Sequence, residues 1–331
     1  MGGAQHVKIV EVCEGVYRLK MPMAAGSVNA YMLRDGQGGW VAIDTGYNSQ
    51  ACREGWQEAM DTLGMGFDKL SRILATHFHW DHLGLGGWFE SSSDAPVYLH
   101  PKDADAYLAE WDSRLHPEKM LAFMMRYGLR GPRVEEFQAQ MAAQGTKDID
   151  LRSGFLPLHD GDRFDVEGGT LYTVLSPGHT PGHCMFYFPE KKLLFSGDMI
   201  MPITFAPVSL RYYGEEDPVG SALESLFLVQ SGELSSPELT CLPGHGWAFA
   251  GPGERAAIEE KYYREKLNHY LERCRKGPVT PYEAAEENSG QDKGRKFRIV
   301  MSEAMSCYEY LRLRGLARRE EDENGVFYYS A

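Results

Sequence analysis

The order of apolar and polar positions predicts a hairpin-rich opening to the chain. Apolar residues recur in three short runs, at residues 7–12, 16–21 and 28–33, each of the length expected for a strand. Turn-forming residues at 35–39 separate the third run from a fourth at 40–44. We therefore expect the chain to begin with antiparallel strands.

Helical and extended patterns alternate after this opening. A helix is predicted from a cap at Asn48 or Ser49 to about residue 63, and another begins near residue 83. Short apolar runs at 70–75 and 97–100 read as buried strands on either side of the second helix. Strands followed by alternating strands and helices indicate an α/β (α+β) fold, in which helices cover the outer faces of a sheet.

Residues 102–152 interrupt this order. Met, Leu and aromatic residues fall there at helical spacing, which predicts three short inserted helices. The insertion suits a lid over a binding site, because Met and aromatic side chains adapt to varied apolar ligands, and it suits simple packing onto the domain equally well. Strands return at 170–175, 193–195 and 239–242, with a helix at about 218–229.

The pattern changes again after residue 252. Apolar positions mark three helices, and residues 320–331 read as a charged turn followed by a strand at 326–329. Three helices and a wing-like end outline a winged-helix module. We therefore divide the chain into a domain at 1–252 and a smaller one at 253–331.

Composition is that of a soluble globular protein. The chain has 331 residues, of which 43% are hydrophobic and 24% charged, enough for a large core. Its six cysteines include no CxxC pair, so free thiols are expected rather than a disulfide framework. Neither a secretory signal nor an apolar run of membrane-spanning length is visible, which favours a cytoplasmic protein without membrane association.

The net charge of −13 lies in the first part of the chain. From Arg255 onward there are 15 basic and 14 acidic residues, and before it 19 basic and 33 acidic residues. Such a surface repels nucleic acid over most of its area, so a small-molecule substrate is the expected partner. The nearly neutral tail suits packing or homodimer formation better than reading DNA.

The densest group of chemically useful side chains lies at residues 76–82. His77, His79, Asp81 and His82 follow a predicted buried strand within six residues. In an extended segment, His77 and His79 point the same way, while the other two lie in the following turn. One short loop can therefore supply two neighbouring metal ions, with the first two residues on one ion and the last two on the other.

Three further candidates follow the ends of later strands. They are His183 in a proline-rich loop, Asp198 after the strand at 193–195, and His245 after the last strand of the front part. Loops that leave neighbouring strands can converge on a shared site. His179 precedes His183 by four residues, and we assign it a supporting role beside the metal ligands.

These motifs together resemble the metallo-β-lactamase superfamily over roughly residues 7–250. The resemblance implies a four-layer αββα sandwich in which His77, His79 and His183 hold a first metal ion. Asp81, His82 and His245 would hold a second ion, and Asp198 would bridge the two. The tail resembles, on weaker motifs, the winged-helix extension of a subgroup that includes the human beta-lactamase-like endoribonuclease and many bacterial hydrolases.

The donor set predicts the chemistry. Imidazoles and carboxylates without a thiolate suit Zn²⁺, with iron or manganese as alternatives. Two ions about 3.5–4 Å apart would lower the pKa of a bridging water from 15.7 towards roughly 7 and supply a hydroxide nucleophile. Asp81 is expected to act as a ligand and, secondarily, to carry a proton to the leaving group.

The leading hypothesis is a metal-dependent hydrolase of a small-molecule ester, thioester or lactone. Asp198 stands where related β-lactamases commonly have a cysteine, and residues 199–202 lack the Gly-Cys-Gly segment of glyoxalase II enzymes. Cleavage of antibiotics or of glutathione thioesters is therefore not favoured. The alternatives are a phosphodiesterase or endoribonuclease acting on single-stranded RNA, an enzyme resembling persulfide dioxygenases with a single iron, and a non-catalytic binding protein.

Overall fold

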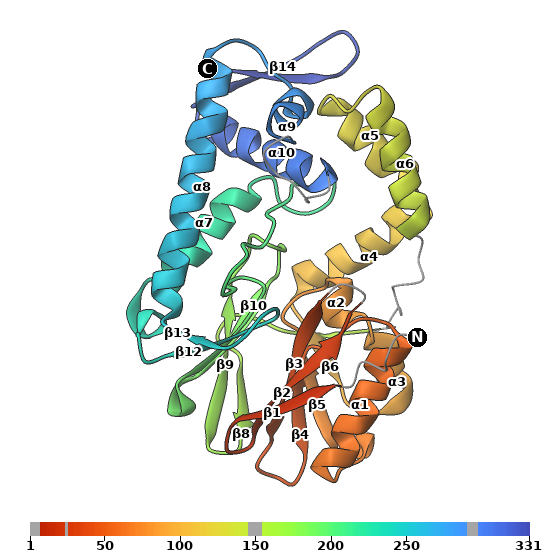
Figure 1. The fold of residues 1–331 in the computed structure, drawn as a ribbon, viewed down its shortest axis with the longest axis vertical. Helices are drawn as coiled ribbons and strands as arrows, with labels where there is room; N and C mark the ends of the chain where they lie inside the picture. Colours follow the sequence, from red (N-terminus) through yellow and green to blue (C-terminus); the bar gives the residue numbers. More distant parts are fainter. Residues whose placement is uncertain (1–6, 24–25, 145–153, 290–296) are drawn as a thin grey trace.

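Two β-sheets lie face to face in the lower part of the molecule, with helices against their outer surfaces (Figure 1). The computed structural model describes residues 7–23, 26–144, 154–289 and 297–331. A long helix and a terminal hairpin extend the molecule upward in the same view. The elements follow the order that the sequence pattern predicts.

The first sheet contains the antiparallel opening and the strand that leads to the 76–82 loop. Its neighbouring strands follow chain order, antiparallel as far as β4 and parallel beyond it. They are β1 (Lys8–Cys13), β2 (Val16–Pro22), β3 (Ser27–Arg34), β4 (Trp40–Ile43), β5 (Leu70–Leu74), β6 (Val97–Leu99) and β7 (Leu156–Pro157). The switch to parallel pairing after β4 requires helical crossovers, as the alternating pattern predicts.

The second sheet carries the loops with the remaining candidate residues. Its order is β13-β12-β11-β10-β9-β8, and only β11 and β12 pair in parallel. The strands are β8 (Arg163–Val166), β9 (Gly169–Leu175), β10 (Cys184–Phe188), β11 (Leu193–Gly197), β12 (Thr240–Pro243) and β13 (Phe249–Ala250).

Alternation along the strands builds the layers. In β10, Phe186 and Phe188 face the core between the sheets, while Met185 faces a core shared with helices on the outer side. The outer face of the first sheet packs on α1 (Gln50–Leu63) and α3 (Gly86–Ser92). The predicted four-layer αββα arrangement is confirmed.

The helix α1 begins and ends at the residues that capping chemistry favours. Ser49 accepts a hydrogen bond from the Cys52 backbone N–H, and Gly64 takes the left-handed conformation after the last turn. Trp56 of this helix packs edge-to-face on Phe89 of α3, with their ring centroids 4.9 Å apart. This packing holds the helical layer over β5, the strand from which the 76–82 loop emerges.

The C-terminal segment shares one continuous core with the second sheet. Its helices and the helix that precedes it are α7 (Pro218–Val229), α8 (Pro252–Arg275), α9 (Pro281–Ser289) and α10 (Phe297–Leu313). The hairpin of β14 (Arg318–Glu321) and β15 (Phe327–Ser330) completes it. The charged stretch expected to be a turn thus begins with a strand. The division at residue 252 and the winged-helix assignment stay predictions.

The predicted helical insertion is present as α4 (Pro101–Leu115), α5 (Pro117–Arg126) and α6 (Pro132–Gln144). Its remaining expected residues, 145–152, lie outside the described ones. The helices pack against the C-terminal segment: Tyr282 N–H donates to the Tyr127 carbonyl, and Arg133 pairs with Glu286 at 2.7 Å. Packing is therefore one role of the insertion.

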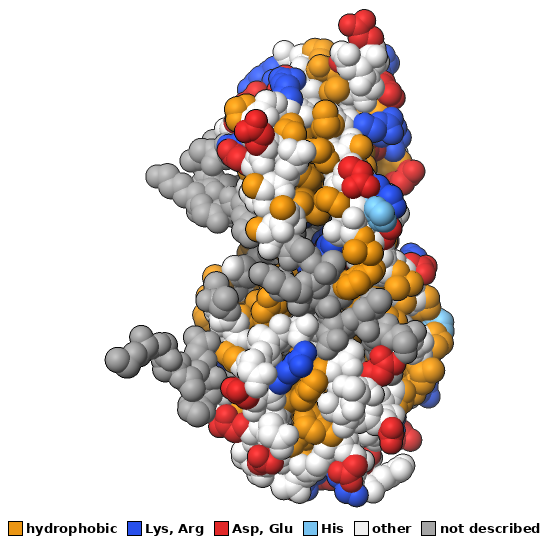
Figure 2. Space-filling view, turned by 90° about the vertical axis from the view of Figure 1, so that its right-hand side faces the viewer, with side chains coloured by type: hydrophobic (Ala, Val, Ile, Leu, Met, Phe, Trp, Pro, Cys, Tyr) orange, Lys and Arg blue, Asp and Glu red, His pale blue; other side chains and the backbone are white. Residues whose placement is uncertain are grey.

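The molecular surface bears on two further predictions. On the face shown in Figure 2, basic side chains are scattered among acidic ones, and those described form no continuous basic patch. Within the described ranges, no helix combines the length and apolar character needed to cross a bilayer. A cytoplasmic location stays a prediction from the sequence.

Candidate metal centre

The 76–82 loop gathers its side chains as its spacing predicts. His77 is fully buried after β5, and its Nε2 lies 3.1 Å from Nδ1 of His79. The short helix α2 (Trp80–Leu83) then begins, so that Asp81 and His82 project from its first turn. The loop thus offers one pair of imidazoles before the helix and a carboxylate with an imidazole on it.

Asp44 fixes this loop from the end of the neighbouring strand β4. Its Oδ2 lies 2.8 Å from Nδ1 of His82, and its Oδ1 accepts the backbone N–H of Thr76 at 2.8 Å. Thr76 Oγ1 in turn lies 3.0 Å from Nδ1 of His77. Sequence reasoning treated Asp44 only as the end of a strand, although a carboxylate beside the ligand-bearing strand was an available signal. Its φ of 61° is a strained conformation of the kind that functional sites retain.

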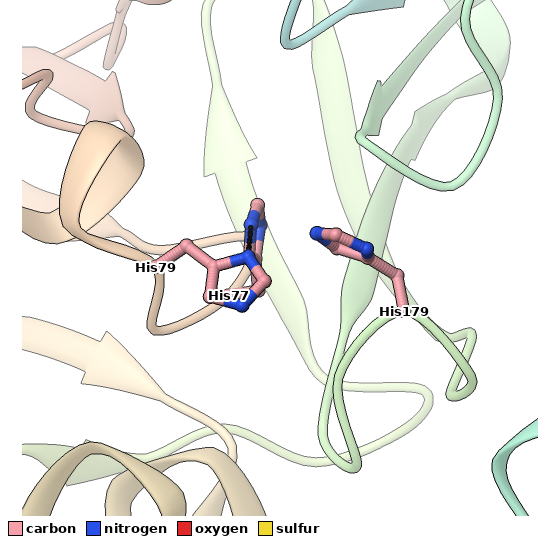
Figure 3. Close-up of side chains that lie close together, drawn as sticks. All are labelled: His77, His79 and His179. Atoms are coloured by element: carbon pink, nitrogen blue, oxygen red, sulfur yellow. Dashed lines mark hydrogen bonds between the residues drawn. The ribbon is translucent and has the colours of Figure 1, made fainter. Parts of the chain in front are cut away.

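His179 lies in the cluster with His77 and His79. The three rings point toward one another, two from the 76–82 loop and one from the loop after β9 (Figure 3). Nδ1 of His179 lies 3.0 Å from the Pro207 carbonyl, to which only a protonated nitrogen can donate. Its Nε2 is therefore left with a free lone pair, and it lies 3.7 Å from Asp198 Oδ2.

His183, which the sequence analysis gave as a ligand, has partners at both ring nitrogens. Its Nδ1 lies 2.8 Å from Ser176 Oγ, and its Nε2 accepts the Asp198 backbone N–H at 3.2 Å. Both ring nitrogens are thus engaged by the protein. The geometry favours exchanging the two histidines of the sequence-based assignment, because His179 faces the cluster and His183 accepts the backbone N–H of Asp198.

Asp198 lies between the two groups of side chains, as expected of a bridging carboxylate. Its Oδ1 is 3.3 Å from Nε2 of His82, and its Oδ2 is 3.6 Å from Nε2 of His245. His245 also lies 3.2 Å from Asp81 Oδ2, while its Nδ1 is 3.0 Å from the Ser27 carbonyl. Side chains from loops that are far apart in the sequence therefore meet in one place.

The part of the chain that carries these side chains is similar to known proteins. The sequence pattern of the metallo-beta-lactamase superfamily matches residues 23–245, about two thirds of the chain. The chain belongs to this superfamily. The matched range contains every candidate ligand from the 76–82 loop to His245.

Individual relatives extend the likeness. The chain is 30% identical over 176 residues to the probable metallo-hydrolase YqgX of Bacillus subtilis, covering 53% of this chain and 67% of that protein. It is 26% identical to the lactamase-like protein adaB of Aspergillus niger, covering 54% of this chain but only 41% of that one. The solved metallo-beta-lactamase family protein TTHA1429 of Thermus thermophilus superposes with a TM-score of 0.80 and 27% identity, over 97% of this chain and 99% of that one. This last likeness includes the C-terminal segment.

The donor atoms fit the metal ions that the superfamily name implies. Among the described residues, His82 Nε2, His179 Nε2 and Asp198 Oδ1 are buried without a hydrogen-bond partner, and all three face the cluster. Buried polar atoms are rarely left unsatisfied, so three that converge indicate a ligand. Three groups of side chains bring their donor atoms within 4.8 Å of one another: His77, His79 and His179; His77, His82 and Asp198; Asp81, His82 and His245.

Electrostatics separates the two sides of the site. Burial, followed by repulsion from neighbouring imidazoles, holds the pKa of His77 well below its usual value, which keeps this ring neutral. Burial also lowers the pKa of His82, but the carboxylates of Asp198, Asp44 and Asp81 outweigh it and raise that pKa well above the usual value. One side of the site thus presents neutral imidazoles, and on the other side the carboxylates favour a positive charge at His82, a place that a metal cation can take.

Proposed function

We propose that this chain is a dinuclear metal-dependent hydrolase of a small-molecule ester, thioester or lactone. His77, His79 and His179 would hold one ion, and Asp81, His82 and His245 the other, with Asp198 between them. The observation that carries the proposal is the convergence of His82, His179 and Asp198 atoms that have no other partner. When bound, the two ions would supply a water of lowered pKa as the nucleophile.

The donor types favour zinc. The proposed set contains imidazole nitrogens and carboxylate oxygens and no thiolate, a combination that zinc accepts readily and that iron and manganese also accept. Three overlapping groups of donors, rather than one, favour a pair of ions over the single iron of a dioxygenase. Zinc is therefore the first metal to test.

The chain's own residues prepare the reaction. Nδ1 of His179 and of His245 each lie 3.0 Å from a backbone carbonyl, which aims the other ring nitrogen of each at the cluster. Although burial opposes ionisation, His245 and His82 hold the pKa of Asp198 well below its usual range, so this carboxylate stays charged. Asp81 is partly exposed and borders His245, a position from which it can pass a proton to a leaving group.

The surface supports a small substrate over RNA. The part of the chain before Arg255 carries a large excess of acidic residues, and the described face in Figure 2 shows no basic track. A polyanion binds through such tracks. Hydrolysis of bis-p-nitrophenyl phosphate would distinguish the phosphodiesterase alternative from a hydrolase of esters, thioesters or lactones.

The test combines metal analysis with a substrate panel. Purified protein is loaded with zinc, iron or manganese and assayed on p-nitrophenyl acetate, an acyl thioester, a lactone and bis-p-nitrophenyl phosphate. We expect two bound ions and turnover of a carboxylic ester, thioester or lactone.

The variant Asp198→Ala tests the bridging position. It should lose more than about 100-fold in turnover, beyond the cost of losing an outer hydrogen-bond partner, and should hold both ions more weakly. Asp94→Ala, which removes an exposed carboxylate, is the matched control and should change neither property. Full activity of Asp198→Ala would contradict the proposed role.

A further inference from the structure

A cavity lies between the helical insertion and the loop that carries His179 and His183. We call it the α4 pocket; it is lined by residues from the stretch 102–109 of α4, by Pro181 and by residues 213–215. Its volume is about 410 Å³, within the range of about 300–1,000 Å³ that is typical of small-molecule pockets. Three segments that are far apart in the sequence thus enclose a space large enough for part of a ligand.

The wall of the α4 pocket is mostly apolar. Ala106 and Ala109 lie three residues apart on α4, so they share one face of the helix, and their small side chains leave room beside it. Pro181 and Tyr213 add a pyrrolidine and an aromatic surface. Apolar surface that leaves water on binding contributes favourable free energy. The pocket therefore suits the hydrocarbon part of a ligand.

The charged residues that line the α4 pocket have both signs. Lys102 and Asp105 are exposed, so the pocket opens to solvent on their side. Glu215, the third charged residue of the lining, accepts a hydrogen bond from Ser221 Oγ at 2.9 Å. One basic side chain beside two acidic ones gives the pocket no charge that matches an anion. The lining therefore favours an uncharged chain over a charged group.

The α4 pocket borders the proposed metal centre. Pro181 lies midway between the two histidines of its loop. The Tyr213 hydroxyl lies 2.9 Å from Arg211 Nη1, and Nη2 of the same guanidinium group lies 3.2 Å from Nε2 of His79. A single guanidinium group thus connects the wall of the pocket to a proposed metal ligand. The chain and the reacting carbonyl group of one small molecule can therefore occupy the pocket and the metal centre together.

Hydrogen bonds fix the walls of the α4 pocket. Asp103 of α4 accepts hydrogen bonds from Thr180 Oγ1 at 2.8 Å and from the Gly182 N–H at 2.6 Å, the two residues that flank the lining proline. Glu110, two turns further along the same helix, accepts one from the Tyr213 hydroxyl. A pocket that is formed before the ligand arrives spares the cost of ordering its walls on binding.

We propose that the α4 pocket binds the apolar acyl chain of the substrate, and so selects esters, thioesters or lactones whose chain has several methylene groups. The proposal rests on the proposed function for its reaction. Burial of one methylene group strengthens binding about fourfold, so the length of the chain is the property that such a pocket selects. Ala109 is the residue to substitute, because a larger side chain there would fill the pocket.

The first experiment measures selectivity for chain length. Zinc-loaded wild-type protein and Ala109→Phe are assayed on p-nitrophenyl acetate and p-nitrophenyl hexanoate. We expect the wild-type kcat/KM for hexanoate to exceed that for acetate by about tenfold or more, since burial of two methylene groups already accounts for this factor. Ala109→Phe should abolish most of the preference.

Ala122→Phe is the matched control. It adds the same side chain on α5, at another cavity of about 410 Å³ that is bordered by Asn324 and Val326 of the C-terminal hairpin. None of the residues that line this second cavity belongs to a loop with a proposed metal ligand. The control should therefore keep the wild-type ratio of the two kcat/KM values.

The second experiment measures binding without turnover. Hexanoate and acetate are titrated calorimetrically into the same zinc-loaded proteins; both have a carboxylate, so their difference isolates the chain. Wild type and Ala122→Phe should bind hexanoate about tenfold or more tighter than acetate, and Ala109→Phe should not. If no ester is hydrolysed, the proposed function fails while this titration still decides the pocket.

Thermal unfolding shows whether each variant is folded. If Ala109→Phe does not fold, Ala109→Leu, which fills less of the pocket, takes its place and should lose part of the preference for hexanoate. Equal affinities of the wild type for hexanoate and acetate would overturn the proposal, and so would an unchanged preference in a folded Ala109 variant.

Discussion

Replacing Asp44 with asparagine changes one hydrogen-bond partner of the proposed metal site while leaving the ligands in place. Asp44 Oδ2 lies 2.8 Å from His82 Nδ1, so the carboxylate holds the proton on Nδ1 and leaves Nε2 free toward Asp198. Asparagine tolerates the φ of 61° at this position about as well as aspartate does. The substitution therefore changes hydrogen bonding and charge with little change in backbone strain.

Either orientation of the new amide is unfavourable. If its NH₂ group faces His82, Nδ1 must accept, and the proton moves to Nε2, the nitrogen needed by the metal. If its oxygen faces His82 instead, the NH₂ group meets the Thr76 N–H, which now donates at 2.8 Å to the carboxylate, and that donor is left unsatisfied.

We expect one ion to be held about 10- to 100-fold more weakly in Asp44→Asn, as is typical for the loss of an outer partner, or about 1.4–2.8 kcal/mol. The affected ion is the one assigned to Asp81, His82 and His245. Competition with a chromophoric zinc chelator, fitted to two sites, measures the change. Asp35→Asn, which alters another buried carboxylate that accepts backbone N–H groups, is the control. Two unchanged zinc affinities in Asp44→Asn would refute the assignment of Asp44 as the group that orients His82.

Two further predictions concern the exchanged histidines and a buried carboxyl group. His179→Ala should lose one equivalent of zinc. His183→Gln should keep both zinc ions but lose stability, because His183 makes buried hydrogen bonds to Ser176 and to the Asp198 backbone. Elemental analysis and thermal unfolding distinguish the two variants, and loss of zinc only from the His183 variant would reverse our assignment. Burial raises the pKa of Glu259 to about 8, so between pH 4.5 and 8 the folded protein holds a proton that the unfolded chain releases, and stability falls as pH rises. Glu259→Gln should therefore unfold at higher denaturant concentration than the wild type at pH 8 and at a similar one near pH 4.5; equal midpoints at pH 8 would contradict the buried-acid interpretation.

The sequence pattern predicted those parts of the fold and the site that depend on residues close together in the chain. The spacing of His77, His79, Asp81 and His82 predicted both their position after a buried strand and their separation into two pairs, because strand and helix geometry fix neighbours in sequence. The positions of most strands along the chain and of the inserted helices followed from hydrophobic periodicity in the same way.

The choice between His179 and His183 was beyond such reasoning. Both lie in one loop, and the distinction depends on which ring nitrogens are occupied by Pro207 and Ser176. Likewise Arg211 pairs with Glu110, which lies 101 residues earlier and on an inserted helix. Non-local contacts of this kind leave no spacing in the sequence from which to predict them.

Residues of the sandwich itself orient proposed ligands: Asp44 holds His82, and the Ser27 carbonyl holds His245. The helical insertion and the C-terminal segment instead contact each other, as Arg133 and Glu286 do. Members of the superfamily that keep the sandwich but change these two appendages should therefore retain the metal chemistry, because Asp44 and Ser27 belong to the sandwich.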